Sequence, residues 1–166
     1  KGRLPMLRPP VRNASSKVMQ IDAATRRNLE ITQALSGGRA GSLLATIDCT
    51  VTAAGGRLLE QRLSAPSLQL DVIENRQSLI DLMLSSPNEM RALRDMLKAV
   101  PDLDRALSRL SLERGGPRDI ANIRDGLEQA KDMDPLLDRL DLKPALETLN
   151  ASFTGHDALI EFLCRA

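Results

Sequence analysis

The sequence has almost no aromatic side chains: there is no Trp and no Tyr, and Phe153 and Phe162 are its two phenylalanines. Sites for single-stranded nucleic acid depend on rings that stack on bases, and sites for quaternary ammonium groups depend on aromatic cages. The composition excludes both kinds of site. It also argues against a β-sandwich or barrel, which uses aromatic and β-branched residues. Leu, Ala, Ile and Met supply most of the apolar residues, and this mixture is typical of helices.

Cysteines and long apolar runs are scarce as well. Cys49 and Cys164 are far apart in the sequence and form no CxxC motif, so no disulfide framework is expected. Few cysteines favour a reducing compartment, and we expect a cytoplasmic protein. No apolar run reaches the 18 or so residues that span a bilayer, so no membrane partner is expected. The first residues lack a signal-peptide core, and because the chain starts without Met we expect it to be a trimmed or excised fragment.

Charge is balanced overall but uneven along the chain. The 23 basic and 22 acidic residues give a net charge of +1. Residues 1–27 carry seven basic groups against the single acid Asp22. Such a segment is either a solvated lead-in or an arm that meets phosphate. Its candidates for DNA binding are weak: Arg8, Arg12 and Lys17.

Apolar spacing and helix-breaking residues predict an all-α fold, an irregular multi-helix bundle of eight or nine helices with at most one short N-terminal strand at 17–21. Asp22 is expected to cap a helix over residues 23–35, which Ser36-Gly37-Gly38 ends. The next predicted helices cover residues 43–48, opened by Ser42, then 52–64 and 68–84. Gly55-Gly56 lie inside the second of these or form a loop at its start.

The second half of the chain is predicted from its caps and prolines. Ser86, Pro87 and Glu89 form a capping-box pattern that opens a helix up to Val100. Helices over 103–110 and from Pro117 follow, separated by Gly115-Gly116. Asp134-Pro135 and Lys143-Pro144 are predicted to divide two short helical pieces, and the last helix is expected to begin between Thr154 and Asp157.

The residues alone indicate no catalytic, cofactor-binding or metal-binding site. None of the five lysines follows a glycine, so there is no phosphate-binding P-loop. His156 is the single histidine and lies in a predicted turn, as an exposed residue at a helix start. Cys49 has no basic neighbour to activate its thiol. The acid pairs Asp102/Asp104 and Asp132/Asp134 are spaced as solvated helix starts.

The arginines are expected to form ion pairs inside the bundle. Arg105 and Arg109 are one helical turn apart and repel each other by a few tenths of a kcal/mol. We expect an acid within the fold to compensate, Asp102 or Glu113 on the same helix, in preference to a partner surface.

Several motifs in a fixed order resemble one family. The run DAATRRNLEIT at 22–32, followed by DCTVT at 48–52, closely resembles the opening of the core, or lever, domain of bacterial MutS mismatch-recognition ATPases. Later G-x-R-x-L, L-x-x-P, I-x-x-R, D-L-x-R and P-R-D elements keep the family's order. The matching positions are Asp22, Arg26, Arg27, Asn28, Arg57, Pro66, Arg76, Arg105, Arg109, Pro117, Arg118 and Asp119. One departure is Arg62, where the family usually has Trp.

The resemblance implies a division of the chain and a role. Residues 1–21 are expected to be a lead-in from a connector domain, and residues 22–166 the N-terminal half of a helical core, or lever, domain. This half would end before an inserted DNA clamp. The chain has neither the Phe-x-Glu motif of the mismatch-reading domain nor a P-loop. The implied role is a structural lever that links the clamp to the ATPase in DNA mismatch repair, without catalysis of its own.

The same resemblance implies cofactors, partners and a location for the full-length protein. These are ATP and Mg²⁺, the other MutS domains, a second MutS subunit, mismatched duplex DNA and MutL, in the bacterial cytoplasm with the nucleoid. The alternative from another class is a free-standing helical adaptor that binds a partner helix in an apolar groove. An enzyme that uses His156 or Cys49 is a third hypothesis. We also expect the isolated chain to expose an apolar patch and to self-associate.

Overall fold

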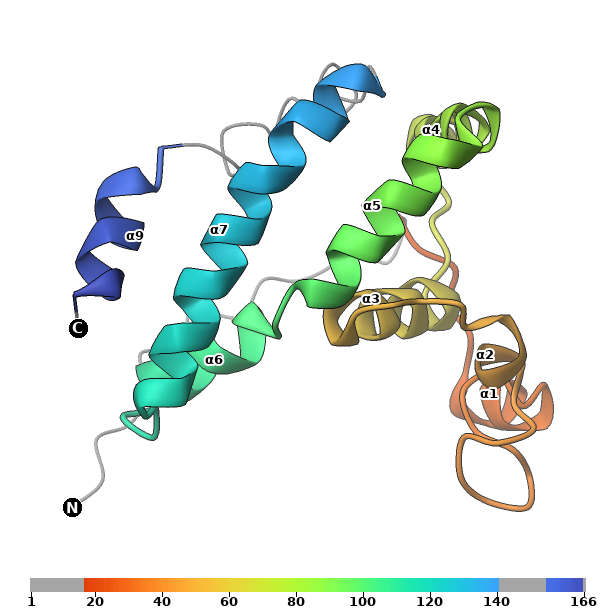
Figure 1. Cartoon of the computed structure of the whole chain (residues 1–166). Coiled ribbons are helices and arrows are strands. Elements are labelled where there is room, and N and C mark those ends of the chain that lie inside the picture. Colours follow the sequence, from red (N-terminus) through yellow and green to blue (C-terminus); the bar gives the residue numbers. More distant parts are fainter. Residues whose placement is uncertain (1–16, 141–154, 166) are drawn as a thin grey trace. The chain divides into compact units, whose positions relative to one another are not determined.

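The computed structural model describes residues 17–140 and 155–165, and every regular element among them is a helix (Figure 1). The described residues form two compact units that meet in sequence between Gln77 and Ser78, inside α4. The first unit contains α1 (Ala23–Asn28), α2 (Leu43–Ile47), α3 (Ala53–Ser64) and the start of α4 (Leu70–Ser85). The second contains the end of α4 and α5 (Pro87–Ala99), α6 (Leu103–Ser111), α7 (Pro117–Arg139) and α9 (Asp157–Cys164). The predicted all-α class is confirmed.

The predicted extended segment before α1 is present as a single antiparallel bridge between Val18 and Ser67. The Met19 amide donates to the Pro66 carbonyl at 2.8 Å, and the Leu68 amide donates to the Lys17 carbonyl at 2.9 Å. Two such bonds hold the chain before α1 against the segment after α3. They do not extend into a strand.

The predicted helix over 23–35 is too long, because α1 ends at Asn28. Glu30 takes a left-handed backbone conformation, with φ 48°. The carbonyls of Glu30 and Ile31 then accept hydrogen bonds from the first amides of α2, at Leu43 and Leu44, both at 2.9 Å. Ile31 and Leu44, which share one of these hydrogen bonds, both have buried side chains. Tertiary hydrogen bonds and burial therefore override the helical propensity of residues 29–35.

The predicted break at Asp134-Pro135 is also wrong, because α7 continues through Pro135 to Arg139. A proline inside a helix costs about 3 kcal/mol. Pro135 is exposed, whereas its neighbours Leu136, Leu137 and Leu140 are 2–6% exposed. Burying a leucine contributes about 1.5–3 kcal/mol, so the three together outweigh the proline. Asp132 and Asp134 consequently lie within a helix and not at a helix start.

Ser86 precedes α5 as predicted, with Pro87 as the first helical residue, but the capping box does not form. The caps of α1, α2 and α3 have extended backbones, with ψ between 149° and 164°, and their side chains accept amide hydrogen bonds. Ser86 has ψ 64° and its side chain caps no amide. Its carbonyl still accepts from the Met90 amide at 2.9 Å, so the helix begins where the sequence predicts.

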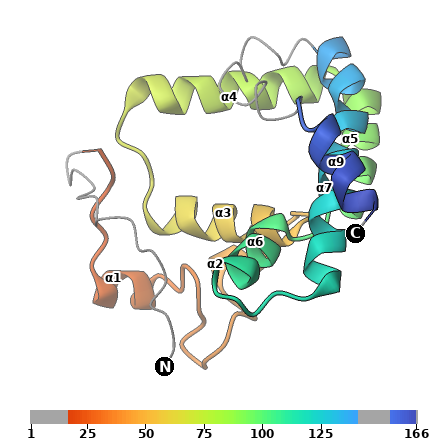
Figure 2. The same cartoon turned by 90° about the vertical axis from the view of Figure 1, so that its left-hand side faces the viewer.

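The core of the second unit lies between α5 and α7. Its buried residues are Leu93, Met133, Leu136, Leu137 and Leu140. The end of α4 and the rest of α5 pack on this cluster through Leu79, Leu82, Met83, Met96, Leu97 and Val100. Both views show α6 and α9 alongside α7 (Figures 1 and 2). No described helix is long and apolar enough to cross a membrane.

Candidate functional site

The three candidates for DNA binding are only partly described. Arg8 and Arg12 lie outside the described residues. Lys17 is exposed, and its backbone carbonyl takes part in the bridge to Leu68. The contribution of these residues to DNA binding therefore stays a prediction.

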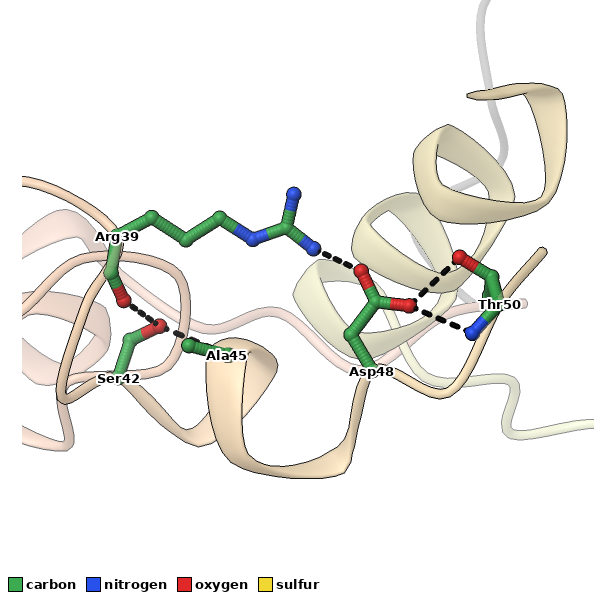
Figure 3. Close-up of polar contacts among 5 residues, drawn as sticks. All are labelled: Arg39, Ser42, Ala45, Asp48 and Thr50. Carbon is green, nitrogen blue, oxygen red and sulfur yellow. Dashed lines mark hydrogen bonds and ion pairs between the residues drawn. The ribbon is translucent and has the colours of Figure 1, made fainter. Parts of the chain in front are cut away.

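The DCTVT motif forms a polar cluster around Asp48, the residue that ends α2 (Figure 3). Asp48 Oδ1 accepts from the Thr50 amide at 2.9 Å and from the Thr50 hydroxyl at 2.6 Å. Asp48 Oδ2 forms an ion pair with Arg39. The two bonds from Thr50, and then the Arg39 charge, hold the pKa of the Asp48 carboxyl below its ordinary value. We call Arg39, Asp48 and Thr50 the Asp48 cluster.

Ser42 caps the N-terminal end of α2 and connects it to the loop that precedes this helix. Its side chain is fully buried, donates to the Arg39 carbonyl at 2.7 Å and accepts from the Ala45 amide at 3.1 Å (Figure 3). Arg39 thus contacts Ser42 through its backbone and Asp48 through its side chain. The cluster connects both ends of α2 to the loop that precedes it.

The DAATRRNLEIT motif is built around a cap and one arginine. Asp22 accepts from the Thr25 amide at 2.9 Å and from the Thr25 hydroxyl at 2.6 Å, and these bonds lower the pKa of the Asp22 carboxyl. Arg26 Nη2 donates to the Ile21 carbonyl at 3.2 Å and to the Ser64 carbonyl at 3.4 Å. Arg26 therefore ties α1 to the end of α3. Arg27 and Asn28 are exposed.

A second polar cluster joins α6 to α7 in the other unit. Asp119 Oδ2 accepts from the Gly116 amide at 2.9 Å and from Arg109 Nε at 3.1 Å. Arg109 also donates to the Arg114 carbonyl at 3.0 Å. The side chain of Asp119 is only 13% exposed. The bond from Gly116, and then Arg109, lower the pKa of the Asp119 carboxyl. We call Arg109, Gly116 and Asp119 the Asp119 cluster.

Asp119 is an acid within the fold that pairs with Arg109, in addition to the acids Asp102 and Glu113 that the sequence suggested for the arginine pair. Asp102 also caps α6 by accepting from the Arg105 amide at 3.2 Å. The sequence could have identified Asp119 as a capping acid. Gly116-Pro117 opens a helix, and Asp119 is the third residue of that helix. An acid at that position caps the helix and reaches back toward the preceding loop.

Most of the remaining motif residues support the fold. Pro66 accepts the bridge from Met19, Arg76 is half-buried, and Pro117 is the first residue of α7. The exposed ones are Arg57, Arg105 and Arg118. Arg62, at the position where the family usually has Trp, is exposed on α3. Partial burial, and then the charge of Arg76, lower the pKa of the Arg62 guanidinium.

The groups considered for catalysis or metal binding do not come together in the described part of the chain. Cys49 and Cys164 are exposed and form no disulfide. His156 directly precedes α9, whose first residue Asp157 pairs with Lys131 at 2.6 Å. Within residues 17–140 and 155–165, no three His, Cys, Asp or Glu side chains are placed to hold a metal ion. The acids at the helix ends serve instead as caps and ion-pair partners.

The second unit has an apolar groove of about 360 Å³ along α5 and α7. Its lining residues are Leu79, Met83, Leu93, Leu97, Val100, Leu103, Gly126, Ala130, Met133 and Leu137. Gly126 is needed because a Cβ at this position would overlap the Leu103 side chain, where α6 approaches α7. Several of these residues belong to the buried core, so the expected exposed apolar patch and self-association both stay predictions.

Comparisons with known proteins agree with the motifs. The family described as MutS domain III matches residues 24–164. Proteins called DNA mismatch repair protein MutS from Paracoccus denitrificans and Dinoroseobacter shibae are 56% and 51% identical over 166 residues. The one from Roseobacter denitrificans is 55% identical over 163 residues, or 98% of this chain. The chain spans 19% of the length of each of these relatives. This chain therefore belongs to the MutS domain III family.

Proposed function

We propose that this chain is the N-terminal half of a lever in a longer DNA mismatch repair protein, and that it transmits conformational change between a DNA clamp and an ATPase. The observation that supports the proposal is that the motif residues hold helices in place. Arg26, Asp48, Arg109 and Asp119 all fasten one helix to another element or to an adjoining loop. A segment that transmits movement needs packed helices with few alternative arrangements.

The chemistry of the described residues supports a mechanical role over a catalytic one. Asp22, Asp48 and Asp119 have their carboxylates committed to helix caps or ion pairs, and their pKa values lie below the ordinary value. An acid catalyst working near neutral pH needs a raised pKa. These carboxyls stay ionised and hold the structure, as a lever requires.

The cofactors and partners of the proposed function belong to the full-length protein. We propose that ATP and Mg²⁺ bind outside this chain. The partners would be the other MutS domains, a second MutS subunit, mismatched duplex DNA and MutL, in the cytoplasm and at the nucleoid. Residues 1–21 would form the connection to a preceding connector domain. The relatives support this because each is named as a DNA mismatch repair protein and is about five times longer than this chain.

The test compares the 166-residue chain with the full-length protein encoded by its gene. We expect the full-length protein to hydrolyse ATP and to bind mismatched DNA. The chain alone should not hydrolyse ATP and should bind DNA only weakly. ATP turnover that co-purifies with the chain through successive columns would contradict the proposal. So would a gene that encodes no ATPase region.

A second candidate is a free-standing adaptor, which the apolar groove along α5 and α7 favours. An adaptor would bind an amphipathic helix from another protein in that groove. The two functions differ in a simple measurement on the isolated chain. An adaptor binds an amphipathic helical peptide saturably in this groove, whereas a chain that serves only as a lever binds no such peptide.

A further inference from the structure

A pocket in the first unit has the chemistry of an anion site. It has a volume of about 470 Å³ and is lined by Ala23, Arg26, Arg27, Thr32, Gln33, Ala34, Leu35 and Gly37. Its charged side chains are two arginines, and no acid lines it. The polar lining groups therefore include guanidinium, hydroxyl and amide donors on a positively charged wall.

The nearby acids already have partners. Glu30 Oε1 accepts from the Leu35 amide at 2.6 Å, in the wall of the pocket. Asp22 is bonded to Thr25 as the cap of α1. Neither carboxylate forms an ion pair with Arg27, so the Arg27 guanidinium stays available to a ligand.

The donors of the pocket are only partly used inside the described chain, where Arg26 Nη2 donates to the Ile21 and Ser64 carbonyls. Arg26 Nε is buried and has no hydrogen-bond partner in the described structure. The side chains of Arg27, Thr32 and Gln33 likewise make no hydrogen bond there. The side chains of Arg27, Thr32 and Gln33 can therefore donate to a ligand in the pocket. An oxyanion suits them, because it accepts several hydrogen bonds and carries the charge that the two arginines neutralise.

We infer that this pocket binds a phosphate group, which Arg26 and Arg27 neutralise and Thr32 and Gln33 orient. Guanidinium groups suit phosphate because their planar fork matches two of its oxygens. The loop that carries Thr32 and Gln33 is held by bonds from the Ala34 amide to the Gly38 carbonyl and from the Gly37 amide to the Ala34 carbonyl, both at 2.9 Å. The site is therefore preformed. The inference is independent of the proposed lever function.

The test is a residue-resolved NMR titration of the 166-residue chain with inorganic phosphate and, separately, with short duplex DNA. We expect saturable shifts at Arg27, Thr32 and Gln33. Shifts with inorganic phosphate indicate a free phosphate ligand, and shifts with DNA alone indicate a backbone phosphodiester. Arg27→Gln should weaken binding about tenfold, as expected for losing a charge-assisted hydrogen bond.

Two further variants distinguish binding in this pocket from a general attraction of anions to exposed arginines. Thr32→Val removes one donor without changing charge and should also weaken binding. Arg91→Gln removes an exposed arginine of α5 that does not line the pocket and should leave binding unchanged. The inference is overturned if neither phosphate source shifts these signals, if Arg27→Gln and Arg91→Gln act alike, or if only an acidic peptide binds.

Discussion

At the scale of single residues, the acids of this chain act by holding helices in place. Asp119 joins the start of α7 to Arg109 of α6 through one oxygen, Oδ2. Its folded-state pKa is below the ordinary value, so it stabilises the fold at pH values above about 4, where the unfolded chain also ionises. This stabilisation is lost as the pH falls through the folded-state pKa.

Asp119→Asn tests that statement. The amide oxygen still accepts from Gly116 but no longer pairs with the Arg109 charge, so we expect a lower urea midpoint at pH 7. The difference from the parent chain should begin to shrink below about pH 4, where the unfolded carboxyl takes up a proton, and should vanish only below the lowered folded-state pKa. Arg109→Gln should have a similar effect, and the double variant should lose less than the sum of the two. Additive losses at every pH would show that the two residues do not act together.

Gly126 is the position where a missing side chain matters most. Gly126→Ala gains about 1 kcal/mol in helix propensity but forces Leu103 to move, and overpacking costs about 1–3 kcal/mol. We expect a net loss of about 1 kcal/mol in the free energy of unfolding, measured by urea titration. Gly56→Ala in α3 is the matched control, because a Cβ there would lie 3.4 Å from Thr50 Oγ1 and 3.9 Å from Asp48 Oδ2, which are ordinary contact distances. It should stabilise the chain, and a gain at both positions would mean that Leu103 adapts freely.

At the scale of elements, local signals predict where helices begin better than where they end. Asp22, Ser42, Thr52 and Asp102 all cap helices through their side chains, as short-range chemistry dictates. The end of α1 and the continuity of α7 depend on long-range contacts of Ile31 with α2 and of Leu136 and Leu137 with the core. Sequence periodicity carries no information on such contacts. The Arg109–Asp119 pair was missed for the same reason.

The proline in α7 provides a test at this scale. Pro135 is exposed and lies one turn before the end of the helix, so Pro135→Ala restores helix propensity without disturbing the core. We expect the free energy of unfolding to rise by about 1–3 kcal/mol. Thermal unfolding followed by circular dichroism measures the change. An unchanged or lower midpoint would indicate that α7 is not continuous through Pro135 in solution.

At the scale of the whole molecule, apolar surface is left uncovered. The groove along α5 and α7 is apolar, and Ile80, Leu84, Leu107 and Phe162 of the same unit are more than half exposed. Patches of this kind mark interaction surfaces. We expect the isolated chain to bind a hydrophobic dye and to associate as its concentration rises, measured by light scattering. Leu84→Gln, at an exposed leucine of the same unit, should reduce both signals, and a monodisperse parent without dye binding would argue against an exposed apolar surface.

We propose that α7 is the stiff element of this lever, and the coupling of ATP hydrolysis to mismatch binding in the full-length protein depends on its stiffness. Gln129→Gly with Asp132→Gly softens α7 by about 1 kcal/mol per site, whereas Gln129→Ala with Asp132→Ala keeps it helical. We predict that the glycine pair retains basal ATP hydrolysis and mismatch affinity but loses most of the mismatch-dependent change in hydrolysis, while the alanine pair behaves as the parent. Full coupling in the glycine pair would contradict the account.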